Sequence, residues 1–117
     1  MTKIIFHILN IIFIILYIYP GSLLGFLIYK DILKQPQISP DFIVSSNHVY
    51  AFLFLSFLGL ISYLKSFKKI ILYLISISII LELLHLIIPN RSFQFSDLFG
   101  NIIGVLIPIL ILILFNF

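Results

Sequence analysis

Four long runs of apolar residues divide the chain, and short polar connections separate them. Each run has close to the roughly 20 residues that a helix rising about 1.5 Å per residue needs to cross a bilayer core. β-Branched residues are abundant, but they do not alternate with polar ones, and four short strands cannot close a barrel. The pattern predicts an all-α chain, an integral membrane four-helix bundle that forms a single domain over residues 1–117. The expected helices cover about residues 4–19, 47–64, 70–88 and 98–115.

The breaks between the runs have local causes. Proline lacks a backbone donor and glycine adds flexibility, so the pair at 20–21 should end or kink the first helix. The segment Ser45–Asn47 offers N-cap side chains for the second helix, and Ser96 or Asp97 can cap the fourth. Three lysines within Lys65–Lys69 are too many to leave in lipid, so they mark the turn between the second and third helices.

The connection after the first run is long and contains an apolar stretch with a lysine at its end, Leu23–Lys34. This stretch can lie as a short helix in the interface plane, or it can extend the first helix past a proline kink. The start of the chain, Lys3 followed by an apolar run, has the form of a secretory signal. No small-residue cleavage site follows Tyr19, so we expect a retained anchor.

Composition agrees with a bilayer environment. The chain is 62% hydrophobic and 9% charged, with a mean hydropathy of +1.29, and has too few polar side chains to cover a water-soluble globule of 117 residues. Cysteine is absent, which excludes a disulfide framework and a thiolate metal site. The net charge of +3 does not indicate nucleic acid, because the lysines are spread over short connections and form no basic face.

The distribution of cations over the loops gives the orientation. With the N-terminus inside, four cations are cytoplasmic and three lie outside, and three of the inside cations fall within five residues. We therefore expect both termini in the cytoplasm. The inside set is Lys3, Lys65, Lys68 and Lys69, and the outside set is Lys30, Lys34 and Arg91.

Polar and small side chains recur at helical spacing on three of the four runs, one face on each. Such faces pack against one another and not against lipid, where a charge costs several kcal/mol. We expect the polar groups to gather in the outward half of the bundle, lining one pocket or network: His48, Glu82, His85, Arg91, Asp97 and Asn101. The faces are His48, Gly59 and Ser62; Ser78, Glu82 and His85; and Asp97, Asn101, Gly104 and Pro108.

Each candidate also has a simpler role open to it. Asp97 can be an N-cap alone, and Arg91 can bind lipid phosphate at the interface. His48 and His85 can be interfacial histidines without chemistry. Glu82 differs from these, because a carboxyl two turns inside a bilayer must be paired, hydrogen-bonded or protonated.

The pair Glu82-x-x-His85 matches the spacing of di-metal carboxylate bundles. Those bundles need the pair twice and two further glutamates, whereas this chain has a single glutamate. Metal ligation by this pair with His48 and Asp97 is therefore the minor interpretation, and we expect no metal and no cofactor.

Two Gly-x-x-x-Gly spacings, at 21–25 and 100–104, are candidate helix-packing motifs. The pair Gly100 and Gly104 is the more credible of the two, because Gly104 lies on the polar face of its helix. His7 has only Asn10 as a polar neighbour at helical spacing, so we interpret it as structural.

The order of these residues resembles the VanZ-like family of small bacterial membrane proteins. In that family the third helix carries Glu-x-x-Gln, a loop carries proline and arginine, and the fourth helix opens with Asp-x-x-x-Asn-x-x-Gly. Upstream, His48 matches the histidine of an Asp-Lys-x-x-His motif, although Val44 and Ser45 replace the Asp-Lys pair. The corresponding residues of the C-terminal half are Glu82, His85 in place of the glutamine, Pro89, Arg91, Asp97, Asn101 and Gly104.

The resemblance implies a multi-pass protein of the bacterial inner (plasma) membrane with a role in the cell envelope, in a family named after a member linked to teicoplanin resistance. We expect a non-catalytic protein whose outward polar pocket binds a lipid headgroup, a lipid-linked wall precursor or an amphipathic antibiotic. Its expected partners are thus membrane lipids, such a lipid-linked ligand and a membrane protein.

Two other functions stay open. The first is an intramembrane enzyme acting on lipid phosphates, with His48 or His85 as the acid–base group and Glu82 orienting it. The second is a helper subunit of a larger membrane complex, because four helices of this size expose much apolar surface.

Overall fold

The computed structural model describes residues 1–37, 39–41 and 44–115, and these residues form helices and connecting loops with no strand. This confirms the predicted all-α class. The elements in chain order are α1 (Thr2–Ile18), α2 (Leu23–Tyr29), α3 (Ser46–Ser62), the 3₁₀ turn η1 (Leu64–Ser66), α4 (Phe67–Leu83), the 3₁₀ turn η2 (Leu84–Leu86) and α5 (Phe95–Leu114).

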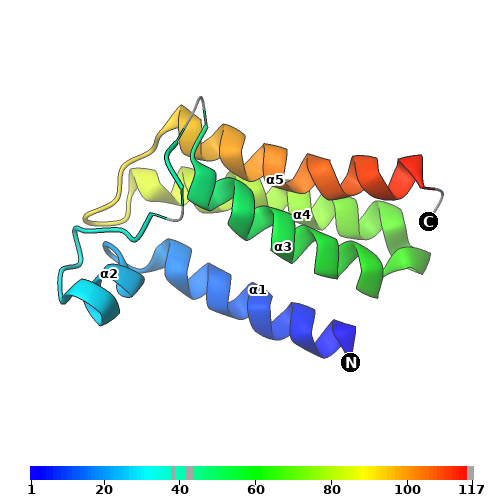
Figure 1. The fold of residues 1–117 in the computed structure, drawn as a ribbon, viewed down its shortest axis with the longest axis horizontal. Coiled ribbons are helices and arrows are strands. Elements are labelled where there is room, and N and C mark those ends of the chain that lie inside the picture. Colours follow the sequence, from blue (N-terminus) through cyan, green and yellow to red (C-terminus); the bar gives the residue numbers. More distant parts are fainter. Residues whose placement is uncertain (38, 42–43, 116–117) are drawn as a thin grey trace.

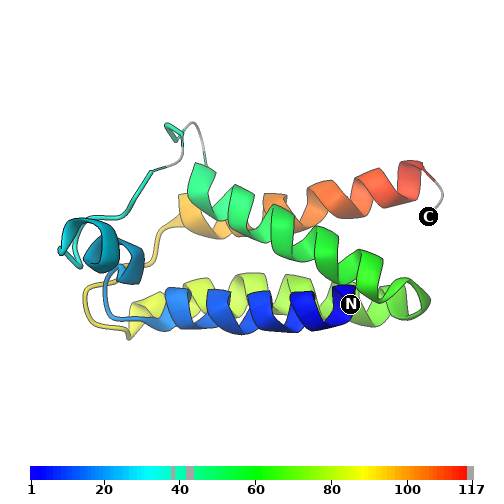
Figure 2. The ribbon, with the colours of Figure 1, turned by 60° about the horizontal axis from the view of Figure 1, so that its bottom comes forward.

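The four long helices α1, α3, α4 and α5 lie side by side, with the start of α1 and the end of α5 at the same end of the molecule (Figures 1 and 2). α3 and α5 make the most extensive helix contact. Glycine permits it, because a Cβ on Gly104 would stand 2.7 Å from the Val49 carbonyl oxygen and 2.8 Å from Phe52 Cβ. A Cβ on Gly100 would stand 2.9 Å from the Ser45 carbonyl oxygen. Both glycines of the predicted packing motif thus face α3.

The ends of two helices differ from those expected. The third expected helix, continued to residue 88, stops as an α-helix at Leu83 and tightens into η2, which ends at Leu86. Pro89 disfavours the helical conformation at Ile88, so the helix does not reach the expected end. The fourth begins at Phe95 with Gln94 as its N-cap. The expectation that Ser96 or Asp97 caps this helix is therefore wrong, and Asp97 lies inside the first turn.

α3 begins at the expected place, but its N-cap differs in mechanism. Ser45 is the N-cap residue and its side chain makes no capping hydrogen bond. Instead, the Ser46 backbone N–H donates to Asp41 Oδ1 over 2.9 Å. This bond, with further hydrogen bonds from the side chains of Gln37 and Ser46, lowers the pKa of the Asp41 carboxyl from its ordinary value.

The connection after α1 turns sharply. Gly21 has a φ of +100°, and a Cβ there would stand 2.7 Å from the Ile32 carbonyl oxygen, so glycine is required on both counts. The Ser22 side chain then accepts a hydrogen bond from the Gly25 N–H and caps α2. The axis of α2 is inclined by 84° to that of α1. The stretch Leu23–Lys34 thus contains a separate short helix, and it does not prolong α1 in line.

Helix lengths set what can cross a membrane. Among the described residues, Leu64–Leu86 (η1, α4 and η2 together) and α5 are each long and apolar enough to span one, and α1 with α2 counts as a third if the bent pair is one broken span. α3 is apolar but shorter, with 17 residues. Large apolar side chains are exposed along the outer faces of all four long helices. These features are those of a membrane protein, whereas passage of all four helices through the bilayer stays a prediction.

Candidate functional site

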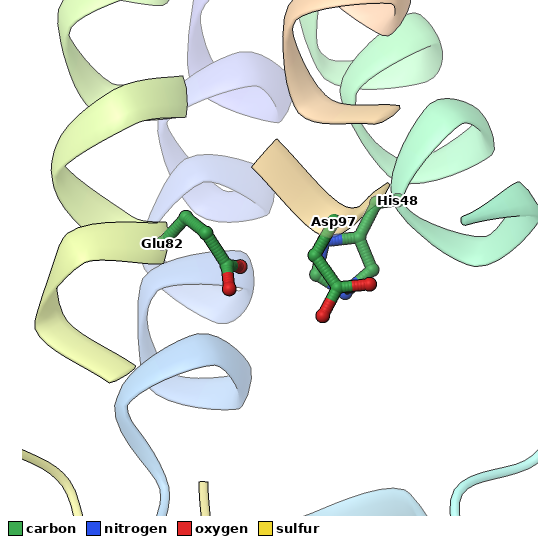
Figure 3. Close-up of side chains that lie close together, drawn as sticks. All are labelled: His48, Glu82 and Asp97. Atoms are coloured by element: carbon green, nitrogen blue, oxygen red, sulfur yellow. Dashed lines mark ion pairs between the residues drawn. The ribbon is translucent and has the colours of Figure 1, made fainter. Parts of the chain in front are cut away.

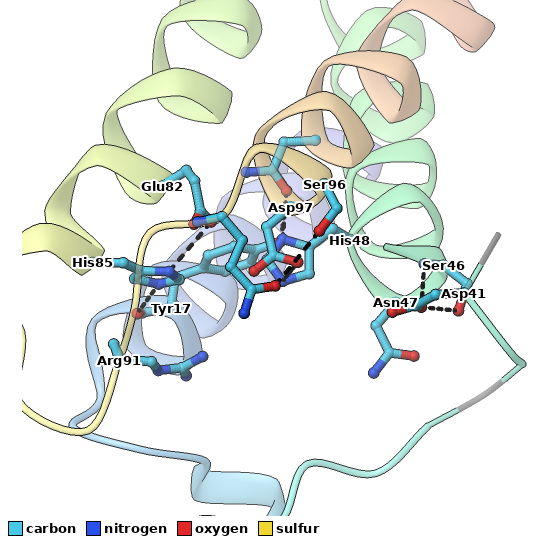
Figure 4. A network of polar contacts seen from close by, with 12 residues as sticks. Tyr17, Asp41, Ser46, Asn47, His48, Glu82, His85, Arg91, Ser96 and Asp97 are labelled. Carbon is cyan, nitrogen blue, oxygen red and sulfur yellow. Dashed lines mark hydrogen bonds and ion pairs between the residues drawn. The ribbon is translucent and has the colours of Figure 1, made fainter. Parts of the chain in front are cut away.

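The candidate residues meet at the end of the molecule where α3 and α5 begin and α4 ends (Figure 4). His48 and Asp97 lie in the first turns of α3 and α5. Glu82 lies in the last turn of α4, and His85 lies in η2. The two helix starts are joined directly, because the Ser45 N–H donates to the Ser96 carbonyl over 3.1 Å. We call the gathered side chains the polar cluster: Tyr17, His48, Glu82, His85, Asp97 and Asn101.

Asn101 is fully buried and connects four helices. Its Nδ2 donates to the Ser78 carbonyl of α4 over 2.9 Å. Its Oδ1 accepts from the Tyr17 hydroxyl of α1 over 3.0 Å and from His48 Nδ1 of α3 over 2.8 Å. Because the Ser78 carbonyl only accepts, the amide nitrogen must face it, which fixes the orientation of the whole side chain.

The amide orientation in turn fixes the tautomer of His48. Asn101 Oδ1 is an acceptor, so His48 Nδ1 carries a proton. His48 Nε2 then faces Asp97 Oδ1 at 3.8 Å, which is longer than a hydrogen bond. A neutral His48 ring therefore presents a lone pair on Nε2 toward a carboxylate.

Glu82 is fully buried, and its two oxygens have different partners. Oε1 accepts the backbone N–H of Gln94, the N-cap residue of α5, over 3.2 Å. Oε2 lies 3.2 Å from His85 Nδ1, an ion-pair contact without hydrogen-bond geometry. His85 Nε2 donates to the Tyr17 carbonyl over 3.0 Å, so the neutral ring has its lone pair on Nδ1, toward Glu82. A neutral His85 ring therefore offers no donor to Glu82 Oε2, and this oxygen has no hydrogen-bond partner among the described residues.

Arg91, in the loop before α5, holds the end of α1. Its Nε donates to the Tyr19 carbonyl over 3.1 Å and its Nη2 to the Leu16 carbonyl over 2.6 Å. These carbonyls belong to the negative end of the helix dipole, where a cation is stabilising. Burial lowers the pKa of the guanidinium, whereas Tyr17 and Glu82 act in the opposite sense. Arg91 therefore has a structural role that the sequence did not indicate.

A cavity of about 580 Å³ opens beside the polar cluster, between α1, α2, the loop after α2 and α3. Tyr17, His48, Arg91 and Asp97 line its polar side. Its apolar side is formed by residues that include Phe13, Leu16, Leu24 and Ala51. Glu82, His85 and Asn101 are buried within the cluster and do not line it. The six expected residues thus divide into three that face the cavity and three that are buried behind it, of which Asn101 holds the ring of His48.

Tyr17 was not among the residues expected from the sequence. A tyrosine near the end of a span is typical of the aromatic belt at a membrane interface, and Tyr19 nearby has the same form. The rotation of α1 decides between them, because Tyr17 lies on the same face as the buried Phe6. Its ring also packs on His48, Phe52 and His85.

Taken together, the fold and the polar cluster define a small all-α protein whose apolar helices suit a membrane and whose ionisable side chains gather at one end. A family model described as VanZ/LLP1 matches residues 4–116. The chain belongs to this family, which confirms the resemblance found in the sequence. Comparisons with curated proteins and with solved structures give no match.

Proposed function

We propose that this VanZ-family protein binds an amphipathic molecule with an anionic headgroup in the cavity beside the polar cluster. The ligand is a lipid, a lipid-linked wall precursor or an acylated antibiotic, consistent with an envelope role that extends to glycopeptide resistance. The observation that carries the proposal is the two-sided lining of the cavity, polar on one side and apolar on the other. Its volume of about 580 Å³ suits a headgroup with the first part of an acyl chain.

The proposal places the cavity at the outer face of the bacterial plasma membrane, with both termini in the cytoplasm and four helices crossing. Both ends of the described chain lie at one end of the molecule, near the lysine-rich η1 region (Figure 1). Lys3 supports this placement, because its ammonium lies 5.1 Å from the Tyr63 ring centre, where aromatic and cationic side chains mark an interface. α5, with 20 residues, is about 30 Å long and matches the bilayer core.

The support for an anionic headgroup comes from one cation, Arg91, whereas two carboxylates, Asp41 and Asp97, also line the same cavity. The Arg91 guanidinium has five N–H donors, of which two bind the backbone carbonyls at the end of α1. Arg91 also lines the cavity, so its remaining donors are placed to bind a phosphate or carboxylate. The carboxylate of Asp97 on the same side can accept from a hydroxyl or ammonium of the headgroup.

The test fills the cavity without touching the polar cluster. Ala51→Phe adds a ring to the apolar wall, and we expect at least a tenfold loss of retained anionic lipid, equivalent to about 1.4 kcal/mol. Leu72→Phe is the matched control, because Leu72 is 68% exposed on the outer face of α4. Native mass spectrometry after extraction with phosphatidylglycerol and phosphatidylethanolamine measures both. Equal retention by the two variants contradicts the proposal.

A second candidate function, an acid–base catalyst acting on lipid phosphates, is favoured by the geometry of His48. Asn101 orients its ring, its Nε2 faces Asp97, and it lines the cavity. His85 is less suited, since it is buried and does not line the cavity. Phosphate release from a lipid phosphate that is lost in His48→Gln but kept in His7→Gln supports an enzyme. No release by the wild type removes this candidate.

A further inference from the structure

Three side chains from three helices approach one another inside the polar cluster (Figure 3). His48, Glu82 and Asp97 each offer one ligand atom, and these atoms all lie within 4.8 Å of one another. His48 Nε2 lies 3.8 Å from Asp97 Oδ1. A tetrahedral zinc ion with bonds of about 2.0–2.1 Å holds its ligand atoms about 3.3 Å apart. Small side-chain rotations are therefore enough to bring the three atoms to metal-binding distances.

The orientation of His48 is that of a metal ligand. Its Nδ1–H donates to Asn101 Oδ1 over 2.8 Å, which leaves Nε2 of the neutral ring with its lone pair toward Asp97. Ligating histidines almost always donate their other ring N–H to an oxygen acceptor, and this second bond fixes the ring. Asn101, itself held by the Ser78 carbonyl, supplies that acceptor.

An independent observation points to a ligand at the same place. Glu82 is fully buried, and within the described part of the chain its Oε2 accepts no hydrogen bond. Its one charged contact there is His85 Nδ1 at 3.2 Å. The hydrogen bond from the Gln94 N–H to Oε1 holds the carboxylate in place. The Glu82 side chain extends from α4 toward His48 and Asp97 (Figure 3). A buried carboxylate oxygen without a donor calls for a cation or a proton.

We propose that His48, Glu82 and Asp97 bind one divalent transition-metal ion, with zinc as the best match. One imidazole with two carboxylates is a donor set of borderline softness, which suits zinc better than calcium or magnesium. The two carboxylates balance the charge of the cation when both histidines are neutral. Since His48 and Asp97 line the cavity, the fourth position of the metal opens toward it.

This proposal revises the expectation of no metal. That expectation was based on the di-metal pattern, which requires a repeated Glu-x-x-His pair within the bundle. A single-metal site needs only one ligand from each of three helices, and sequence spacing does not display such a site. The competing arrangement consists of two imidazolium–carboxylate pairs, His48 with Asp97 and His85 with Glu82, and no metal.

The test measures metal on the full chain in detergent. The protein carries a purification tag without histidine and is first stripped of metal with a chelator. It is then equilibrated with zinc and dialysed, and elemental mass spectrometry measures the number of zinc ions per chain. We expect one zinc per chain, and tetrahedral d–d absorption bands after exchange with cobalt. His48→Gln, Glu82→Gln and Asp97→Asn should each weaken zinc binding at least about tenfold.

Matched controls separate the site from other residues of the same kind. His7→Gln and Asp31→Asn lie outside the polar cluster, and both should bind zinc as the wild type does. Asp97 is only partly buried, so Asp97→Asn keeps its helix even if Glu82→Gln does not fold, as circular dichroism will report. Wild-type protein without zinc, or Asp97→Asn and His48→Gln with wild-type affinity, overturns the proposal. No lipid is added, so this result is independent of ligand binding in the cavity.

Discussion

Replacing Asn101 by leucine tests whether the polar cluster stabilises the fold. The two side chains have nearly the same shape, and Asn101 is fully buried, so the change removes hydrogen bonds and leaves packing almost intact. Three bonds are lost, to the Ser78 carbonyl, the Tyr17 hydroxyl and His48 Nδ1. At about 0.6–1.5 kcal/mol for each bond within a membrane protein, the expected loss of unfolding free energy is about 2–4 kcal/mol.

Reversible unfolding in mixed micelles with increasing SDS, followed by circular dichroism, measures this loss. Asn10→Leu is the matched control, because Asn10 makes one side-chain hydrogen bond, to the Tyr73 hydroxyl, away from the polar cluster. Its expected cost is below about 1 kcal/mol. If Asn101→Leu lowers the unfolding free energy no more than Asn10→Leu does, the polar cluster does not hold the helices together.

Three further predictions follow from single contacts. Gly104→Ala should lower the unfolding free energy by about 1–3 kcal/mol in the same assay, because the added Cβ would stand 2.7 Å from the Val49 carbonyl oxygen. A loss near zero would show that α3 and α5 can move apart freely. Arg91→Gln should lower the unfolding free energy by about 1 kcal/mol, and Arg91→Lys by less, since the cation at this position stabilises the last carbonyls of α1. Equal losses in both variants contradict this role of Arg91. The lowered pKa of Asp41 means that its stabilisation is present above the unfolded pKa and is lost as pH falls through the folded pKa. Asp41→Asn should therefore flatten the acid side of the stability profile, and an unchanged profile contradicts this assignment.

Much of the fold was predictable because long apolar helices are encoded by length and composition. The four long helices begin within a few residues of the expected starts, and Pro20 with Gly21 ends α1 as expected. Helix ends were harder to predict. The N-cap residue Gln94 donates its backbone N–H to the carboxylate of Glu82, which is distant in sequence. A local sequence pattern does not indicate such a partner.

The site was partly predictable for a related reason. Charged and amide side chains are costly in lipid, so Glu82 and Asn101 had to face protein, and the structure buries both. The sequence did not reveal which atoms meet. Tyr17 joined the cluster through the rotation of α1, and Arg91 turned toward the carbonyls of that helix. The contacts of Tyr17 and Arg91 both depend on how α1 packs against the other helices. The sequence does not determine this packing, because the apolar residues around α1 are of similar size.

Photolabelling shows whether an amphipathic molecule occupies the cavity beside the polar cluster. A phosphatidylglycerol with a diazirine near its headgroup is irradiated with the protein in nanodiscs, and labelled peptides are mapped by mass spectrometry. We expect the label to be concentrated on residues 13–24 and 47–51, the cavity-lining parts of α1, α2 and α3, and to be strongly reduced there in Ala51→Phe. Label spread evenly over the outer faces of the helices, and unchanged in Ala51→Phe, contradicts it.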